Sequence, residues 1–366
     1  MLGRRSLVVL WGRDQGANNV LDLVEKSVKE QGIWTLRIPG LNSAISEEHR
    51  SVALHASAVV LGVSGNVPEA KFAYGLLAQN PKLAGKIVFI EDFPTSNGTQ
   101  DPLLRSMGSA LHLCAILPSA PNAPELSVYR QVHTVGYPDH WIPAIENIRF
   151  GIEARKSGGI RKRRRGGVGS CFVGRDEVII YVSGFSGFTA GYLRQIMEIE
   201  KVLGVPVVIH YRAHPSEQNR PELSQVIKER DALLEGRWEI ANQEISDAGR
   251  DSDPRLIGVS DITVANPGHV STFFAGSLRK KMVCIMEFLE NKDVGSSSYD
   301  YRFAGFRTHL IESFSDLLQA VKALLDDGSP ESKNLAEKQR LNTIPFDPQN
   351  PPSYGKNVVD VIKNLI

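Results

Sequence analysis

Short apolar runs alternate with amphipathic stretches over most of the chain. Runs such as "AVVLGV" (58–63) and "EVIIYVSG" (177–184) read as strands with both faces buried. Strands of this kind, separated by helices, are typical of parallel sheets that helices cover on both sides. This alternation of apolar runs and amphipathic stretches begins again near residue 177. The sequence therefore predicts an α/β fold with two tandem doubly wound, Rossmann-like domains that face a cleft.

The individual elements follow from the same pattern. Apolar residues at every third or fourth position mark the helices, and short apolar runs bounded by turn residues mark the strands. We expect strands at 7–10, 34–38, 58–63, 86–92, 110–118, 131–138, 177–184, 206–212, 238–242, 261–266, 282–288 and 308–313. We expect helices at 19–31, 68–78, 191–203, 221–234, 269–279, 315–326 and 357–366.

The chain has 366 residues, which is too long for one ordinary core and fits two domains. We expect a first domain over 1–150, a basic linker over 151–176 and a second domain over 177–345. A proline-rich extension and a final helix, 346–366, follow and can dock on either domain.

The linker contains five consecutive basic residues, Arg161 to Arg165, among glycine and serine. Such a run is compatible with nuclear localisation or nucleic-acid binding. It also fits a solvated linker or the polar face of a short helix. A third interpretation places these side chains at the mouth of the cleft between the domains, facing an anionic ligand.

Composition excludes several classes of protein. The net charge is +1, so no global field attracts nucleic acid or a membrane. The three cysteines are far apart, which argues against a zinc site or a disulfide framework and favours a reducing, cytoplasmic compartment. The apolar run Leu7–Trp11 is too short for a signal peptide, and no stretch is long enough to span a membrane. We expect no metal and no cofactor, and the three aspartates at 247–253 fit a solvated loop.

Polar residues follow the expected strands of the first domain. "WGRDQGANN" (11–19) follows the first strand but lacks the GxGxxG dinucleotide fingerprint, so it is either an anion-binding turn or a plain one. Ser64, Gly65 and Asn66 form a polar turn that either contacts a ligand or caps the next helix. Glu91 and Asp92 end the fourth strand, where a carboxylate can act as a base or hold sugar hydroxyls.

The second domain has the richer set of candidates. Gly184 and Gly187 lie in its first strand-to-helix loop, where free backbone N–H groups suit a pyrophosphate. Arg212 ends the next strand and can bind a phosphate or carboxylate through two hydrogen bonds, and His214 follows just before a proline. A further strand leads into a helix start with a glycine, an imidazole and two hydroxyls, namely Gly268, His269, Ser271 and Thr272.

With these motifs the sequence resembles the glycosyltransferase-B superfamily. The superfamily includes non-hydrolysing nucleotide-sugar 2-epimerases, glycerophosphotransferase-like enzymes and related surface-carbohydrate proteins. The resemblance touches most of the chain through "GVSGN" (62–66), "FIEDFP" (89–94), "HTVGYPDHW" (133–141), "RAHP" (212–215), "SD" (260–261) and "GHVST" (268–272).

The resemblance implies an enzyme that transfers a sugar or polyol-phosphate from a nucleotide-activated donor to a carbohydrate-type acceptor, in polysaccharide or surface-carbohydrate synthesis. The first domain would then be the acceptor side, with Ser64, Gly65 and Asn66 near the acceptor. The second would hold the nucleotide diphosphate through Arg212, Gly184, Gly187, Gly268, His269, Ser271 and Thr272. The catalytic groups would be Glu91, Asp92 and His214. No stable nucleic-acid partner is expected, and an oligomer is possible.

Two departures from the family pattern keep other functions open. Many members carry a glutamate where Ala275 or Gly276 stands here, and "RKKM" (279–282) replaces their Gly-Lys-Pro. The missing glutamate favours a non-catalytic ligand-binding or assembly protein on the same fold. Epimerisation at carbon 2 of a nucleotide sugar is the other alternative within the fold.

Overall fold

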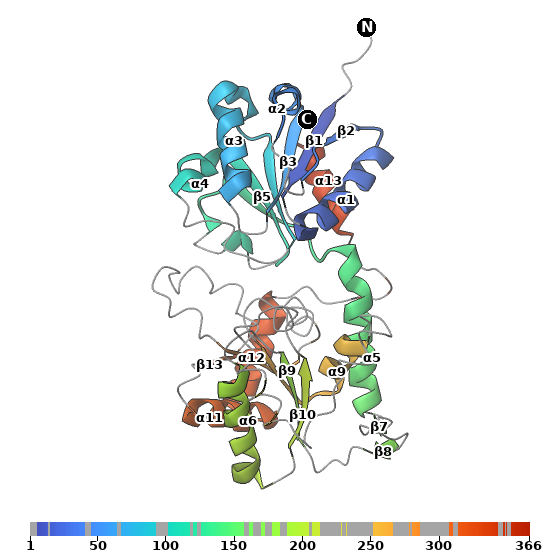
Figure 1. The fold of residues 1–366 in the computed structure, drawn as a ribbon, viewed down its shortest axis with the longest axis vertical. Helices are drawn as coiled ribbons and strands as arrows, with labels where there is room; N and C mark the ends of the chain where they lie inside the picture. Colours follow the sequence, from blue (N-terminus) through green and yellow to red (C-terminus); the bar gives the residue numbers. More distant parts are fainter. Residues whose placement is uncertain are drawn as a thin grey trace. The chain divides into compact units, whose positions relative to one another are not determined.

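The computed structural model (Figure 1) forms two compact units. Unit 1 comprises Met1–Ile142, Gly295–Arg302 and Asn342–Ile366, and unit 2 comprises Pro143–Val294 and Phe303–Leu341. The structure describes residues 6–13, 15–40, 45–63, 67–92, 102–117, 120–122, 126–156, 161–163, 170–172, 178–183, 189–204, 207–212, 252–265, 280–285, 307–309, 314–342 and 353–366, with 228, 232, 278, 347 and 349.

Unit 1 is built on a six-stranded parallel sheet in the order β2-β1-β3-β4-β5-β6. Its strands are β1 (Leu7–Gly12), β2 (Trp34–Arg37), β3 (Ala58–Val63), β4 (Ile87–Glu91), β5 (Leu111–Ala115) and β6 (Gln131–Thr134). The described side chains of β4 and β5 are buried at every position, which explains why both read as continuous apolar runs. The strand order reverses between β1 and β3.

Helices cover both faces of this sheet, as Figure 1 shows. They are α1 (Gln15–Glu30), α2 (Glu47–Leu54), α3 (Val67–Gln79), α4 (Pro102–Met107) and α13 (Tyr354–Lys363), with 3₁₀ turns at Pro81–Leu83, Gly108–Ala110, Ala120–Asn122 and Asp139–Trp141. The apolar stripe of α1 is buried, as its helical spacing predicts. On the other face, the ring of Phe72 from α3 meets Trp11 of β1 edge to face.

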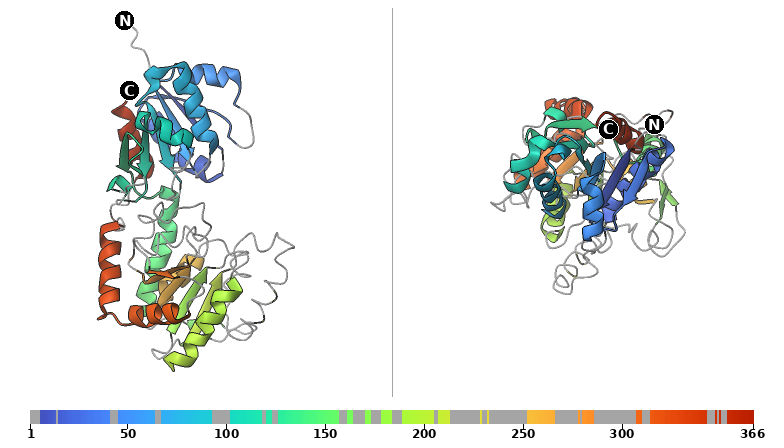
Figure 2. Two further views of the ribbon diagram at one scale, coloured as in Figure 1. Left: turned by 90° about the vertical axis from the view of Figure 1, so that its left-hand side faces the viewer. Right: turned by 90° about the horizontal axis from the view of Figure 1, so that it is seen from above.

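The C-terminal helix α13 belongs to unit 1 although more than 200 residues separate it from β6. It packs against α1, and Figures 1 and 2 show it among the N-terminal elements. Its buried residues are Tyr354, Gly355, Val358, Val359 and Ile362. Gly355 is needed at the crossing, because a Cβ there would lie 2.7 Å from the carbonyl oxygen of Leu23.

Unit 2 contains a five-stranded parallel sheet in the order β10-β9-β11-β12-β13. The strands are β9 (Val178–Ser183), β10 (Val207–Arg212), β11 (Ile262–Ala265), β12 (Met282–Ile285) and β13 (Arg307–His309). The helices are α5 (Ile142–Lys156), α6 (Thr189–Leu203), α9 (Ser252–Val259), α11 (Phe314–Leu325) and α12 (Pro330–Asn342). One core joins β9, β10 and β11 to α6, α11 and α12.

Part of the segment expected to be a linker forms regular secondary structure. Helix α5 occupies Ile142–Lys156 and buries Ile145, Ile148 and Gly151. A two-stranded antiparallel ladder follows, in which β7 (Arg161–Arg163) pairs with β8 (Ser170–Phe172). The other basic residues of the run, at 164 and 165, lie outside the described residues. The strand expected at 238–242 and the helix expected at 269–279 also lie outside them, as does nearly all of the helix expected at 221–234.

Polar contacts anchor α5 and α9 at the amino ends of the second sheet's strands. The Asp261 carboxylate, directly before β11, accepts hydrogen bonds from Arg155 Nη2 (3.1 Å) and from the N–H of Ile179 (2.8 Å). The Lys280 ammonium donates to the carbonyls of Gly258 and Ser260, where α9 ends. The "SD" pair therefore lies at the amino end of β11, whereas the "GHVST" motif follows the carboxyl end of β11 in the sequence.

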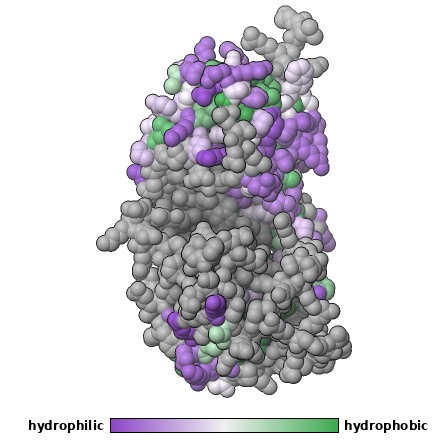
Figure 3. Space-filling model, in the orientation of Figure 1, coloured by the Kyte–Doolittle hydropathy of each residue, from purple (hydrophilic) through white to green (hydrophobic). Residues whose placement is uncertain are grey.

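On the described part of the face in Figure 3, hydrophilic residues predominate and hydrophobic ones are scattered. None of the described helices combines the length and apolar character that a bilayer crossing requires.

Candidate functional site at the carboxyl ends of the two sheets

Each parallel sheet has a point at which its strand order reverses, between β1 and β3 in unit 1 and between β9 and β11 in unit 2. In open α/β sheets, ligands bind outside the carboxyl ends of the strands at such points. Most of the residues that the sequence singled out follow these strand ends directly. The two edges are therefore the candidate site, and each is described by itself.

In unit 2 the edge is defined by the last residues of β9, β10 and β11. Arg212 is the last residue of β10 and is paired in register with Ser183, the last residue of β9. Its backbone therefore lies at the carboxyl edge, one strand away from the reversal point. The remaining unit 2 candidates lie outside the described residues: Gly184, Gly187, His214, Gly268, His269, Ser271 and Thr272.

In unit 1, Glu91 is the last residue of β4 and is paired with Val63, the last residue of β3. Its side chain is fully buried, and its Oε2 accepts a hydrogen bond from the N–H of Ile116 (2.8 Å), just after β5. The Tyr354 hydroxyl donates to the Glu91 carbonyl. The Glu91 carboxylate thus ties two strand ends together away from solvent.

The charge of Glu91 affects its buried neighbours. The pKa of the Cys114 thiol is raised, mainly by burial and further by the Glu91 carboxylate. The pKa of Tyr129 is raised well above its ordinary value for the same two reasons, in the same order. These groups stay protonated near neutral pH, so this part of the edge offers no thiolate or phenolate nucleophile.

Asp92 follows Glu91 and is only partly buried. Burial raises the pKa of Tyr354, and the negative charges of Glu91 and Asp92 raise it further. Of Glu91 and Asp92, Asp92 is the less buried residue, although its Oδ1 atom is itself shielded from solvent. The other acceptor-side candidates, Ser64, Gly65 and Asn66, lie outside the described residues.

Glu69 is a carboxylate at this edge that the sequence analysis did not single out. It lies in the first turn of α3, is fully buried, and its Oε1 accepts a hydrogen bond from the N–H of Arg13 (3.0 Å). It therefore holds the turn after β1 against the helix that follows β3. The sequence feature that could have pointed to Glu69 is an acidic residue in the first turn of a helix. Such residues are common at helix starts, because a negative charge there interacts favourably with the helix dipole.

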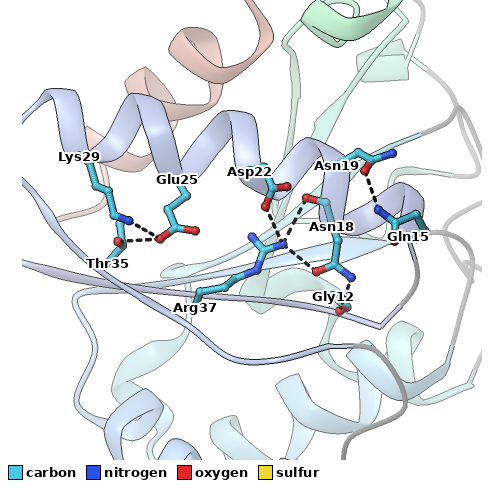
Figure 4. A network of polar contacts seen from close by, with 9 residues as sticks. All are labelled: Gly12, Gln15, Asn18, Asn19, Asp22, Glu25, Lys29, Thr35 and Arg37. Atoms are coloured by element: carbon cyan, nitrogen blue, oxygen red, sulfur yellow. Dashed lines mark hydrogen bonds and ion pairs between the residues drawn. The ribbon is translucent and has the colours of Figure 1, made fainter.

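The turn after β1 is held by the polar network of Figure 4. The Asn18 side chain donates to the Gly12 carbonyl (3.3 Å) and accepts from Arg37 Nη2 (2.7 Å). Arg37 also reaches Asp22 (3.3 Å), and burial lowers the pKa of its guanidinium. Asn18 thus fixes β1, α1 and β2 to one another, which favours the plain-turn interpretation for this residue.

The "HTVGYPDHW" segment docks the C-terminal helix. Asp139 Oδ1 accepts a hydrogen bond from the N–H of Tyr354 (2.9 Å), the first residue of α13. The Asn357 amide donates to the Val135 carbonyl (2.8 Å). Burial lowers the pKa of His140, and the neighbouring Asp139 partly opposes that shift. Asp139 and the Val135 carbonyl therefore hold the C-terminal helix within unit 1.

Comparisons with known proteins agree with this architecture. No family model matches the chain, and no curated protein matches it in sequence. Its structure resembles that of MurG from Acinetobacter baumannii (11% identity, TM-score 0.51, covering 98% of this chain and 99% of that one). It also resembles a glycosyltransferase from Rickettsia africae ESF-5 (10%, TM-score 0.51, 99% of both chains) and a UDP-N-acetylglucosamine 2-epimerase from Rickettsia bellii (11%, TM-score 0.50, 99% of this chain and 97% of that one).

The chain has the glycosyltransferase-B fold. The resemblance inferred from its motifs is confirmed at that level, because these neighbours match nearly the whole chain. At such low identity the likeness shows the fold alone. Glycosyltransferases and epimerases share it, so the choice between them depends on the site.

This glycosyltransferase-B fold carries a histidine pair on its first sheet that no motif indicated. His112 on β5 and His133 on β6 stack, and Nδ1 of the first lies 3.0 Å from Nε2 of the second. Burial lowers the pKa of both rings, and for His112 the charges of His133 and Arg130 lower it further. The native sheet thus favours two neutral imidazoles, one donating and one accepting.

This pair predicts a loss of stability in mild acid. Between the ordinary histidine pKa of 6.5 and the lowered native values, the unfolded chain binds more protons than the native one. The free energy of unfolding should therefore fall as the pH drops below about 6.5, by up to ~1.4 kcal/mol per pH unit for each site. Urea titrations at pH 5 to 8 give the free energy of unfolding at each pH. This free energy should change less with pH in His133→Gln than in the native chain. An equal pH dependence in the two proteins would contradict the inference that the histidine pair is neutral in the native state.

Proposed function

We propose that this protein transfers a sugar or polyol-phosphate from a nucleotide-activated donor to a carbohydrate-type acceptor. The observation that carries the proposal is the position of Arg212 at the carboxyl edge of the second sheet, level with the end of β9. In a glycosyltransferase-B fold, a cation there suits the diphosphate of a leaving nucleotide. When a sugar is transferred, negative charge builds on the nucleoside diphosphate as the bond to the sugar breaks. When a polyol-phosphate is transferred, the bond between the two phosphates breaks and the charge builds on the departing nucleoside monophosphate. In both cases a fixed guanidinium lowers the barrier.

The donor side would be unit 2. Arg212 offers two parallel N–H donors to phosphate oxygens. Backbone N–H groups at Gly184 and Gly187, after β9, and at Gly268, before a helix, would complete the diphosphate cradle. The hydroxyls of Ser271 and Thr272 would add hydrogen bonds. His269 and His214 would lie beside the transferred group, with His214 able to exchange a proton there.

The acceptor side would be unit 1, with Asp92 as the general base. Glu91 and Asp92 were equal candidates by sequence, but Glu91 is fully buried and its carboxylate accepts a hydrogen bond from the Ile116 N–H, whereas Asp92 is only partly buried. A base must approach the acceptor hydroxyl within hydrogen-bond reach. We therefore assign proton abstraction to Asp92 and a positioning role to Glu91. Ser64, Gly65 and Asn66 would contact the acceptor.

Arg212→Ala should weaken the binding of a nucleotide diphosphate sugar by roughly 10- to 100-fold. The reason is the loss of charge-assisted hydrogen bonds worth about 1.5–3 kcal/mol. Calorimetric titration with UDP-, CDP-, GDP- and ADP-sugars measures the effect and identifies the donor base. Lys201→Ala is the matched control, because it removes an exposed cation from α6 of the same unit and should bind normally.

Three outcomes would redirect the proposal. If neither the four sugar nucleotides nor a nucleoside diphosphate polyol such as CDP-glycerol binds, the non-catalytic alternative is favoured. If Arg212→Ala binds as tightly as the native chain, the diphosphate site is elsewhere. If a bound donor exchanges its carbon-2 hydrogen with deuterated water when no acceptor is present, the reaction is epimerisation, which the similarity to the Rickettsia bellii epimerase keeps open.

A further inference from the structure

Strand β2 forms one edge of the first sheet (Figure 1), and within the described residues β1 is the only strand that pairs with it. The N–H groups of Trp34 and Ile38 donate to carbonyls on the β1 side. Because backbone groups alternate in direction along a strand, those of Thr35 and Arg37 point away from the sheet. Within the described residues no hydrogen bond is found at these two backbone positions. Such an open row of N–H and C=O groups can pair with another strand.

Strand β2 has few of the features that protect an open edge, which are proline, unpaired charge and a covering segment. Its one charged residue, Arg37, is held against α1 by Asn18 (2.7 Å) and Asp22 (3.3 Å). The chain after β2 turns back over the end of β1, where a Cβ on Gly40 would lie 1.8 Å from a backbone oxygen of that strand. At the open edge, Trp34 is 55% exposed. The edge is therefore suited to burial against a partner.

The side chains of β2 divide between the two faces of the sheet. Thr35 Oγ1 donates to Glu25 of α1 (3.3 Å), and the Arg37 guanidinium also contacts α1. Successive side chains of a strand point to opposite faces. Trp34 and Leu36 therefore share the face away from α1, and both are apolar.

The flank of α1 beside β2, drawn in Figure 4, carries a charge of opposite sign toward each end of the strand. Asp22 lies at the carboxyl end of β2, next to Arg37, and its side chain is 71% exposed. Lys29 lies at the amino end, where its carbonyl accepts from the N–H of Gly32, and its side chain is 61% exposed. Between them, Glu25 is 19% exposed and paired with Lys29. The exposed charges are thus negative at one end and positive at the other.

We propose that this protein forms a two-fold symmetric dimer in which β2 pairs antiparallel with β2 of a second copy. With Thr35 on the axis, the outward backbone groups of the two copies exchange hydrogen bonds. Directly opposite residues share a face, so Trp34 then meets Leu36 of the partner subunit, twice by symmetry. On the other face, Asp22 lies beside Lys29 of the partner subunit, and this contact also occurs twice.

These features favour a second copy over a strand from another protein. A two-fold interface repeats each contact across its axis, so the surface must be complementary to itself. The edge of β2 and the flank of α1 meet that condition, because a half turn brings apolar to apolar and negative to positive. A single foreign strand would cover the backbone groups but would bring no helix flank to Asp22 and Lys29.

The test is sedimentation equilibrium of the full chain, in which we expect a monomer–dimer equilibrium. Asp22→Lys and Lys29→Asp should each weaken the dimer roughly tenfold or more, because each variant places like charges opposite one another at two sites. An equimolar mixture of the two variants should associate again, since each offers the charge that the other lacks. The matched control is Asp360→Lys, an equal charge reversal at an exposed position of α13, which should dimerise like the native chain.

Thr35→Pro tests the strand pairing itself. Proline is tolerated on an edge strand where its missing N–H would face solvent, so unit 1 should keep its fold while the hydrogen bonds on the axis are lost. The dimer should then be absent. Circular dichroism and thermal midpoints of all four variants should match those of the native chain, so that a loss of association reports the interface and not unfolding.

Three results would overturn the proposal. The first is a native chain that stays monomeric up to about 100 μM, where even a weak specific interface associates. The second is a mixture of Asp22→Lys and Lys29→Asp that associates no better than either variant alone. The third is a Thr35→Pro chain that dimerises like the native one. Donor binding by Arg212 is measured separately, so failure here leaves the proposed function standing.

Discussion

We expect that ending the chain at Ser353, which removes α13, abolishes the cooperative unfolding of unit 1. Tyr354, Val358, Val359 and Ile362 are at most 2% exposed. Burying an apolar side chain of this size is worth about 1.5–3 kcal/mol, so the four together approach the ~5–15 kcal/mol that stabilises a typical domain. The truncation also removes the hydrogen bonds to Glu91, Val135 and Asp139. Hydrogen exchange followed by peptide mass spectrometry should show protection lost across β1, β4 and α1.

A single substitution in α13 tests the packing of this helix in unit 1 without removing the helix. Ile362→Ala should lower the free energy of unfolding by about 2–5 kcal/mol, because it leaves a cavity on the buried face of α13, the helix that packs against α1. The matched control on the same helix is Asp360→Ala, whose exposed side chain should contribute less than ~0.5 kcal/mol. If the truncated chain unfolds at the same urea concentration as the native one, α13 is not part of the unit 1 core.

Gly258→Val should destabilise unit 2 by about 3 kcal/mol or more. Helices α5 and α9 cross with their backbones in contact, and a Cβ on Gly258 would lie 2.1 Å from the carbonyl oxygen of Ile148. The opposing Gly151 is just as confined, because its Cβ would lie 2.3 Å from the Arg255 carbonyl oxygen. Backbone atoms cannot rotate out of the way as a side chain can, so the helices must separate. Urea unfolding with hydrogen exchange on α9 and β9 measures the loss.

The control for this crossing is another helical glycine. Among the described residues, a Cβ on Gly75 of α3 would meet only the flexible end of Arg50, whose Nη1 would lie 3.3 Å away. Gly75→Ala should therefore be neutral or stabilise by up to ~1 kcal/mol, since alanine is the better helix former. If Gly258→Val changed the free energy of unfolding no more than Gly75→Ala does, the close approach of the α5 and α9 backbones would be contradicted.

The strands were the most predictable part of this fold. Runs such as "IVFIE" in β4 and "VIIYVS" in β9 are buried on both faces, and only a parallel sheet under two helix layers accommodates that pattern. The helices with a strong apolar stripe, α1, α11 and α13, were also foreseen, because their periodicity is visible without a structure.

Five of the described helices were not expected, namely α2, α4, α5, α9 and α12. For α12 and α5 the physical reason can be named. Helix α12 buries little besides Leu335, Ser332 and Gln339, so its sequence shows no apolar stripe. Helix α5 buries Ile145, Ile148 and Gly151, and a glycine at a helix crossing gives no hydrophobic signal. Its basic end also merges with the run at 161–165, which made the whole segment read as a linker.

The candidate site was predictable in outline but not in detail. The sequence placed Glu91 and Asp92 at the end of a strand, and the structure agrees. It could not separate their roles, because burial of Glu91 depends on Ile116 from the next strand and Tyr354 from the far end of the chain. Glu69 was overlooked because its partner, the N–H of Arg13, is 56 residues away.

The sequence by itself determined the class of fold, the approximate positions of its main strands, and the concentration of charge in one segment. All three depend on patterns within a few neighbouring residues. Only the tertiary structure decided that Lys280 caps α9, that Asp261 anchors α5, and that α13 completes the first unit. These contacts join residues far apart in the chain, and a buried polar group is stabilised by whichever partner the fold brings to it.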